Sequence, residues 1–199
     1  MKFMYCILVT GIPASGKSTM AGFLAEAFGL PVISKDRIKE LMYDTIGFRS
    51  REEKVKLGTA AMEIMYDTAE QLMKSGQPFL LENNFENASK AGLDAILDKY
   101  AYKPITVILT GDTKIIYQRF LERNSSPDRH PGHVVNDCYP GSRETGCPVR
   151  LSYESFADGI VQRGMDTFTA NGPQIIVDTT DYSRVDREAL VRRIREEMV

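Results

Sequence analysis

The chain has 199 residues, of which 43% are hydrophobic and 26% are charged, and its formal net charge is −2. These values are ordinary for one globular domain with a core of its own, and they exclude collagen-like and low-complexity proteins. The charge balance lacks the basic excess that usually accompanies nucleic-acid binding, so a nucleic-acid partner is not expected.

Three cysteines are an odd number and do not make a disulfide framework. No apolar run approaches the roughly 20 residues that cross a bilayer. The first apolar run, residues 3–9, is too short for a signal peptide with its cleavage site. The sequence therefore predicts a protein of the reducing cytoplasm with no membrane partner, and it leaves the oligomeric state open.

Strands and helices are predicted to alternate along the chain. Residues 3–9 are continuously apolar, which indicates a strand covered on both faces, and a glycine-rich loop follows at residues 11–19. This alternation predicts an α/β domain with a largely parallel sheet. Further strands are predicted at 30–33, 78–81, 105–109 and 175–177, and helices at 20–28, from 36 onward, and at 62–73, 93–97, 115–121, 151–161 and 185–198.

Two stretches are predicted to be irregular. Residues 47–58 are polar and charged, which indicates a mobile loop or a frayed helix. Residues 125–148 contain four prolines, both histidines and two of the three cysteines, which indicates a loop inserted into a domain. We expect a single domain over residues 1–199 with an insertion at about 124–150.

Residues 11–18 match the phosphate-binding loop pattern G-x-x-x-x-G-K-[ST]. Glycines let backbone amides turn inward around an anion, and the following helix directs its positive end at it. Lys17 is expected to reach the β- and γ-phosphates, and the Ser18 hydroxyl to bind Mg²⁺. The predicted nucleotide-binding residues of the loop are Gly11, Ile12, Pro13, Ala14, Ser15, Gly16, Lys17, Ser18 and Thr19.

The rest of the chain narrows the class of nucleotide-binding protein. It has no N-K-x-D motif of a G protein, and the nearest match to the Asp-terminated strand of motors and ring ATPases is Phe79-Leu80-Leu81-Glu82. The loop, Ser34-Lys35-Asp36-Arg37, Leu81-Glu82-Asn83-Asn84 and the Arg119-to-Ser125 stretch instead resemble the small P-loop kinases of the AAA-type, polynucleotide kinase, zeta toxin and chloramphenicol phosphotransferase group. Gluconate, shikimate and adenylate kinases belong to the wider group.

The resemblance implies a three-layer P-loop NTPase fold with a five-stranded parallel sheet, order 2-3-1-4-5, and a lid over the phosphates. It also implies an ATP- and Mg²⁺-dependent kinase that moves the γ-phosphate to a hydroxyl of a small molecule or nucleotide. The residues themselves do not identify that acceptor or separate ATP from GTP.

Four residues take part in catalysis under this resemblance, beginning with Lys17 of the loop. Asp36 would accept the proton of the acceptor hydroxyl, although an Asp at this place could instead cap the next helix. Arg123 and Arg129 would contact the transferring phosphoryl group, and Arg119 would stack on adenine. A solvated basic surface is the alternative for these arginines.

A second set of residues would bind the acceptor. Arg37 or Lys39 would neutralise an anionic acceptor, with solvated surface charge as the alternative. Glu82 would hold Mg²⁺ through water or bond to the acceptor, or else pair with a lysine as a buried carboxylate. Asn83 and Asn84 follow a strand at its carboxyl end, where open α/β sheets bind ligands, and suit an acceptor rich in hydroxyls.

The predicted insertion holds His130 and His133, which could grip an anionic acceptor or lie on plain loop surface. With Cys138 and Cys147 they could also form a four-ligand zinc site, although the spacing matches no known signature. Cys6 lies within an apolar strand and is expected to be a small buried hydrophobic residue.

Three other functions stay open. The protein could be a nucleotide-dependent switch without phosphotransfer, which the presence of both Asp36 and Arg123 disfavours. It could also be a nucleic-acid 5′-end kinase, which the net charge disfavours, or a toxin-type kinase acting on a nucleotide sugar.

Overall fold

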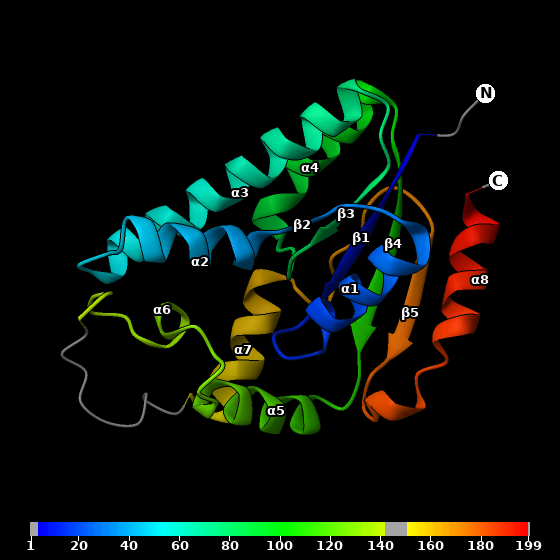
Figure 1. The fold of residues 1–199 in the computed structure, drawn as a ribbon. Coiled ribbons are helices and arrows are strands. Elements are labelled where there is room, and N and C mark those ends of the chain that lie inside the picture. The colour runs from blue at the N-terminus through cyan, green and yellow to red at the C-terminus, as the bar shows by residue number, and fades with distance from the viewer. Residues whose placement is uncertain (1–3, 142–150, 199) are drawn as a thin grey trace.

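The structure is a computed structural model that describes residues 4–141 and 151–198 (Figure 1). Five parallel strands form one sheet in the order β2-β3-β1-β4-β5. This confirms the predicted fold class and strand order. The strands are β1 Tyr5–Gly11, β2 Val32–Ser34, β3 Phe79–Glu82, β4 Lys103–Thr110 and β5 Gln174–Asp178.

Helices cover both faces of this sheet: α1 and α8 pack on one side, and α3 and α4 on the other (Figure 1). None of the helices in the described ranges combines the length and the apolar character needed to span a membrane. The helices are α1 Lys17–Phe28, α2 Lys35–Thr45, α3 Arg51–Lys74, α4 Asn87–Tyr100, α5 Thr113–Ser125, α6 Pro131–Val134, α7 Tyr153–Arg163, the 3₁₀ helix η1 Tyr182–Arg184 and α8 Arg187–Glu197.

The position of strand β1 in the middle of the sheet explains why its sequence is continuously apolar. Cys6 and Leu8 point into the core beneath α3 and α4, whereas Ile7 and Val9 point into the core beneath α1 and α8, and all four are fully buried. Side chains alternate across a strand, so a strand in the middle of a three-layer domain needs apolar residues at every position. The prediction for this strand and for a buried Cys6 is confirmed.

The carboxyl ends of neighbouring strands bring three distant segments together. In the parallel register, Ser34 at the end of β2 pairs with Glu82 at the end of β3, and Glu82 in turn pairs with Val9 of β1. Two residues further along β1, Gly11 begins the phosphate-binding loop. Ligands bind at this edge in open α/β sheets, and here it collects residues 11–18, 34–36 and 82–84.

The prediction of a mobile loop or frayed helix at residues 47–58 is wrong from Arg51 onward, because α3 begins there, whereas residues 47–50 are not helical. The Ser50 side chain accepts a hydrogen bond from the Glu53 amide, and the Glu53 carboxylate accepts one from the Arg49 amide. This Ser-x-x-Glu arrangement is a recognised helix start. Most side chains in the first two turns of α3 are exposed, so these turns need no apolar residues. Their sequence therefore lacks the apolar stripe by which a helix is usually predicted.

Helix α7 also differs in part from its prediction. Phe156 and Ile160 are buried against α5, as expected. Val161 is 65% exposed, and Leu151 precedes the helix and is 40% exposed. Only two of the four apolar residues that the sequence indicated, Phe156 and Ile160, therefore face the core.

The segment 126–141, which follows α5, is docked on α2 and α3. Lys54 of α3 is only 7% exposed, and its ammonium donates to the backbone oxygens of His133 and Val135 and to the Oδ1 of Asn136 at 2.5–3.2 Å. Phe48 and Tyr139 exchange two backbone hydrogen bonds of 2.8 Å. In Figure 1 the short helix α6 lies beneath α2 accordingly.

Both histidines of this segment meet carboxylates of α2. His130 Nε2 lies 3.0 Å from Asp44 Oδ1, and His133 Nε2 lies 2.9 Å from Glu40 Oε1. Gly132 lies so close to the Tyr43 ring that a Cβ would come within 2.5 Å of it. Segment 126–141 and α2 therefore form one packed unit.

We expect Lys54→Met to lower the free energy of unfolding by about 2 kcal/mol. The methionine cannot donate a hydrogen bond, so the part-buried carbonyl oxygens of His133 and Val135 lose the donor that they now have. Urea unfolding measures this directly. Lys56→Met is the matched control on the same helix. The Lys56 side chain is 71% exposed and pairs with exposed Glu52, so the change should stay within about 0.5 kcal/mol. Equal losses in the two variants would contradict the role of Lys54.

Candidate functional site

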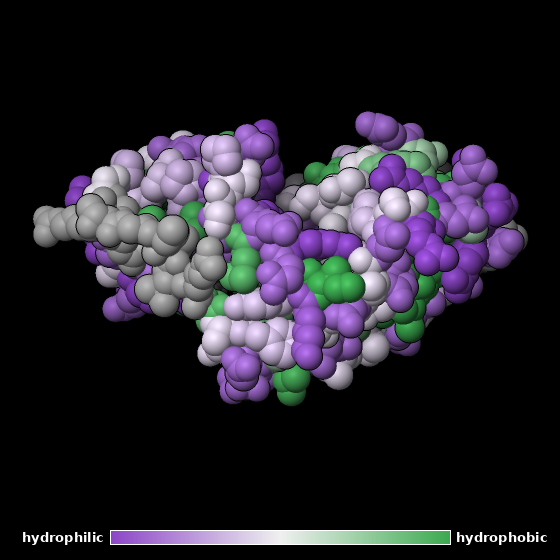
Figure 2. All heavy atoms as spheres, turned by 90° about the horizontal axis from the view of Figure 1, so that it is seen from below, coloured by the Kyte–Doolittle hydropathy of each residue, from purple (hydrophilic) through white to green (hydrophobic). Residues whose placement is uncertain are grey.

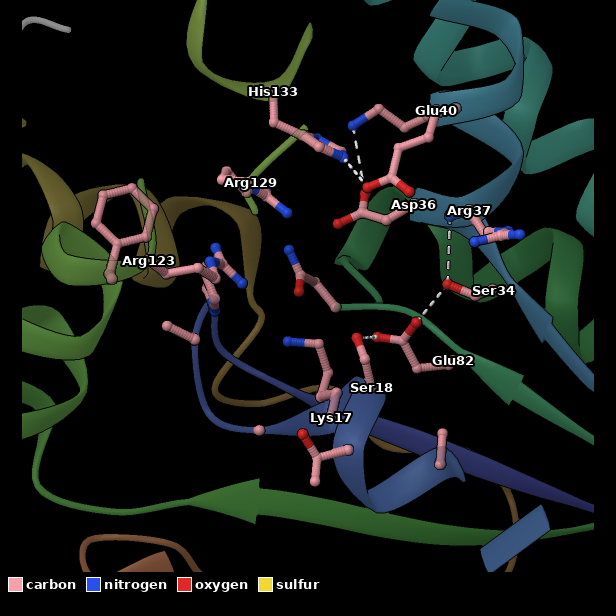
Figure 3. A pocket seen from close by; sticks show the side chains of 18 of the residues that line it. Lys17, Ser18, Ser34, Asp36, Arg37, Glu40, Glu82, Arg123, Arg129 and His133 are labelled. Carbon is pink, nitrogen blue, oxygen red and sulfur yellow. Dashed lines mark hydrogen bonds and ion pairs between the residues drawn. The ribbon is translucent and has the colours of Figure 1, made fainter. Parts of the chain in front are cut away.

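A cavity of about 800 Å³ opens at the carboxyl edge of the sheet, between the phosphate-binding loop, α2, α5 and segment 126–141. Viewed from below, hydrophilic side chains gather around the hollow (Figure 2), and Figure 3 shows how they converge. Most of the residues singled out from the sequence line it. They are Pro13, Ala14, Gly16, Lys17, Ser18, Thr19, Asp36, Arg37, Lys39, Glu82, Asn84, Arg119, Arg123, Arg129 and His133.

The phosphate-binding loop has the backbone that an inward-turned cradle requires. Gly11, Ala14 and Gly16 have φ angles of 141°, 67° and 94°. A Cβ on Gly11 would lie 2.3 Å from the Leu109 carbonyl oxygen, so only glycine fits there. Ser15 is fully buried, and its hydroxyl has no hydrogen-bond partner within residues 4–141 and 151–198. An orphaned buried donor in such a loop fits an anion acceptor.

Lys17, the first residue of α1, is 7% exposed. Its ammonium donates a 2.8 Å hydrogen bond to the Ile12 carbonyl oxygen. Burial lowers its pKa to about 8; Glu82 opposes this shift, and Arg123 and Arg129 add to it. A buried cation whose charged form is disfavoured gains from a nearby anion.

Arg123 of α5 and Arg129 of segment 126–141 face the same space as Lys17 (Figure 3). Their Nε atoms are buried and have no hydrogen-bond partner in the described part of the chain. Burial lowers the pKa of both, that of Arg123 to about 10, and Arg129 adds to the shift of Arg123 by repulsion. Three cations thus converge where carboxylates alone do not balance them, which suits a polyanion such as a triphosphate.

Ser18, Glu82 and Ser34 form a chain of oxygen groups beside the loop (Figure 3). The Ser18 hydroxyl donates to Glu82 Oε1 at 3.4 Å, and the Ser34 hydroxyl donates to Glu82 Oε2. Burial raises the pKa of Glu82, while the Ser34 hydrogen bond and Lys17 act in the opposite direction. A hydroxyl and a carboxylate next to a phosphate site are hard oxygen donors that fit Mg²⁺.

Asp36 lies in the first turn of α2 and lines the cavity. The cap of this helix is Ser34, whose side chain accepts from the Arg37 amide, so the alternative of Asp36 as the cap is wrong. Asp36 Oδ1 lies 3.4 Å from the Lys39 ammonium. Burial would raise the pKa of Asp36, but the nearby Lys39, His133 and Arg129 outweigh it and hold that pKa well below its usual range.

The two histidines differ in position. His133 lines the cavity, and burial lowers its pKa to about 3, so the ring is neutral near pH 7. His130 lies outside the lining, against Asp44. Within the described ranges no group of three or more histidine, cysteine and acidic side chains could hold a metal, and the predicted zinc ligand Cys147 lies outside those ranges.

Two predicted residues have unexpected contacts. Arg119 lines the cavity, but its guanidinium donates to the backbone oxygens of Thr179 and Thr180, so it also holds the loop after β5. Asn83 is not part of the lining, and its amide lies 3.9 Å from the Met62 sulfur. Gly11, Ile12 and Ser15 shape the loop without lining this cavity.

Three residues of the site were not singled out for a role from the sequence. Ser34 joins Glu82 to α2, and a serine before a helix is a known cap signal that could have found it. Glu40 pairs with His133 across 93 residues of sequence. Tyr182 packs on Gly16, where a Cβ would lie 2.5 Å from its ring. No local sequence pattern predicts the contact of Glu40 with His133 or that of Tyr182 with Gly16.

Known proteins share this fold. One similar structure is a candidate kinase from Chloroflexus aurantiacus, with 28% identity, 99% of each chain covered and a TM-score of 0.80. A sugar kinase from Janibacter has 13% identity, covers 98% of this chain and 94% of its own, and has a TM-score of 0.56. A gluconokinase from Sinorhizobium meliloti has 16% identity, coverages of 98% and 96%, and a TM-score of 0.55. No curated protein matches the chain by sequence.

The identities to the Janibacter and Sinorhizobium proteins are low enough that these likenesses concern the fold alone. Together with the strand order described above, the similar structures establish a kinase-like P-loop fold. The sequence match is more specific, because residues 6–138 fit the AAA_33 family model, described as an AAA domain. The chain therefore belongs to the AAA_33 family of AAA domains.

Proposed function

We propose that the protein is a kinase that uses ATP and Mg²⁺ to phosphorylate a hydroxyl group of a small molecule or nucleotide. One observation carries this proposal: a carboxylate, Asp36, lines the same cavity as Lys17, Arg123 and Arg129. A volume of about 800 Å³ is within the range of nucleotide-sized pockets. A protein that only binds a nucleotide needs the cations and a carboxylate for Mg²⁺, such as Glu82, but it does not need a second carboxylate to accept a proton.

The phosphate donor would occupy the loop at residues 11–18. The amides of the loop and the positive end of α1 favour the phosphates there. Lys17 would exchange the Ile12 carbonyl for a phosphate oxygen. Arg123 and Arg129, whose Nε atoms have no hydrogen-bond partner among the described residues, would gain anionic partners. These three cations would oppose the charge that builds up on the γ-phosphoryl oxygens during transfer.

Mg²⁺ would be held through the Ser18 hydroxyl, with Glu82 binding directly or through water. The ion would neutralise charge on the phosphates when it is bound. Ser34 keeps the Glu82 carboxylate in place, since its hydroxyl donates to the oxygen that does not face Ser18.

Asp36 would orient the acceptor hydroxyl and take its proton. A new bond forms between the acceptor oxygen and the γ-phosphorus, and the bond from that phosphorus to the bridging oxygen breaks, so ADP leaves with the electron pair. Its low pKa keeps Asp36 ionised at neutral pH. A weak base suffices, because in a loose transition state the proton moves late and positioning dominates.

Segment 126–141 would act as part of a lid. It carries Arg129 and His133 into the cavity and is tied to α2, which carries Asp36. Movement of this unit would bring the base and a phosphate-binding arginine toward the loop together. Closure of this kind excludes water, which would otherwise compete with the acceptor for the phosphoryl group.

We expect Asp36→Asn to lower acceptor-dependent ADP release by about 10²–10⁴-fold, because the amide cannot take the hydroxyl proton. ATP affinity should change by less than about threefold, since Asp36 does not belong to the phosphate loop. A panel of hydroxyl compounds with ATP and Mg²⁺ measures release above the rate in water. Asp98→Asn, an exposed carboxylate change on α4, is the control.

Unchanged acceptor-dependent turnover in Asp36→Asn would show that the base is assigned wrongly. If no hydroxyl compound raises ADP release above the water rate, the switch without phosphotransfer becomes the better explanation.

The affinity for ATP should fall about tenfold between pH 7 and pH 9. Lys17 binds phosphate only when it is charged, and its pKa of about 8 in the free protein means that most of it loses its proton over this range. Equilibrium titration with a fluorescent ATP analogue measures the slope. Lys17→Met should bind weakly at every pH with no slope, and a wild-type affinity that does not change up to pH 9 would contradict the prediction.

A further inference from the structure

A second cavity, of about 780 Å³, lies between α2, α3 and α4. Lys39 and Arg163 line both this cavity and the first one, so the two spaces adjoin there. The first turn of α2 separates them: Asp36 lines the first cavity and Lys35 the second. The proposed function leaves this second space without a role.

The place where the cavities adjoin is rich in cations. Lys35, Lys39 and Arg163 line it, coming from α2 and from the end of α7. Lys39 pairs with Asp36 at 3.4 Å, and Arg163 pairs with Glu86 at 3.3 Å.

Lys35 is different, because it is half-buried and makes no hydrogen bond or ion pair within residues 4–141 and 151–198. Burial lowers the pKa of Lys35, and the neighbouring Lys39 lowers it further by repulsion, while Glu86 and Asp36 oppose this shift without cancelling it. A half-buried ammonium facing other cations costs free energy unless an anion joins it.

The second cavity is lined by charged and apolar residues. The acidic residues Glu63, Asp67 and Glu70 belong to α3, and the fourth, Glu86, is already paired with Arg163. Met62 and Tyr66 of α3 contribute an apolar wall. A ligand with a single anionic group would therefore be oriented, with that group at Lys35 and its body over the apolar wall.

We propose that the acceptor carries an anionic group, a carboxylate or a phosphate, which Lys35, Lys39 and Arg163 bind at the entrance of the second cavity while its hydroxyl reaches Asp36. This inference rests on the proposed function and names the class of its acceptor. The Lys39 ammonium lies 3.4 Å from Asp36 Oδ1. An anionic oxygen in contact with Lys39 would then lie within about 6 Å of Asp36, which a molecule of three to six carbons spans.

The test uses calorimetric titration of three probes with the same carbon skeleton: glycerol, glycerate and glycerol 3-phosphate. The full-length protein is first saturated with Mg²⁺ and a non-hydrolysable ATP analogue, so that the phosphate loop is filled. We expect at least one anionic probe to bind at least tenfold more tightly than glycerol, and the tighter of the two identifies the anionic group.

Lys35→Gln should weaken binding of that anionic probe by about tenfold, which is the loss of one charge-assisted contact. Arg163→Gln, a change at a half-exposed side chain, should weaken it to a similar degree. Lys56→Gln, on the exposed face of α3, should leave it unchanged. Thermal unfolding of each variant checks that the fold is intact.

The inference is overturned if neither anionic probe binds up to about 50 mM, if glycerol binds as tightly as they do, or if Lys35→Gln stays within about twofold of the wild type. The saturation step is itself followed by calorimetry, and binding of the ATP analogue in that step tests the proposed function separately. Failure at that step would contradict the kinase proposal, whereas failure at the probe step would contradict only the acceptor class.

Discussion

Three buried cations around one loop are the constraint on which the rest of the structure depends. Lys17, Arg123 and Arg129 each lose hydration in the same cavity, and burial lowers the pKa of each. Such a group destabilises the protein unless anions compensate for it, and Glu82 and Asp36 do so only in part. The strain in the loop backbone, with Ala14 at a positive φ, belongs to the same arrangement. A phosphate chain would offset the cost of the buried charges and bind to the backbone amides that this loop conformation turns inward.

Helix α2 connects this phosphate side to the acceptor side. Its cap, Ser34, is bonded to Glu82 beside the loop, and its middle and end are bonded to the histidines of segment 126–141. Consecutive residues of a helix point about 100° apart, which places Asp36 toward one cavity and Lys35 toward the other. In the proposed mechanism, this one short helix supplies both the base for the acceptor hydroxyl and a cation for the anionic group of the acceptor.

The sequence was most informative where a local pattern determines the structure. The apolar run of β1 depends on neighbours in the chain, and its prediction is confirmed. The loop at 11–18 likewise has the inward-turned backbone that its pattern predicts. The start of α3 was missed, although Ser50 and Glu53 carried the signal, because exposed polar turns look like a loop.

Contacts between distant segments could not be predicted in this way. Lys54 reads as one more surface lysine, and only the fold shows that its ammonium is buried against carbonyl groups about 80 residues away. The same holds for Arg119, whose partners follow β5, and for His133, whose partner lies on α2. Residue type identified these side chains as polar candidates, whereas tertiary packing decides what they bind.

A crystal structure with Mg²⁺ and a non-hydrolysable ATP analogue tests the central claim most directly. We predict phosphates in the loop at residues 11–18, the Lys17 ammonium moved from the Ile12 carbonyl onto a phosphate oxygen, and Arg123 in contact with the terminal phosphate. A structure in which Lys17 still bonds to Ile12 and the nucleotide lies elsewhere would contradict this claim.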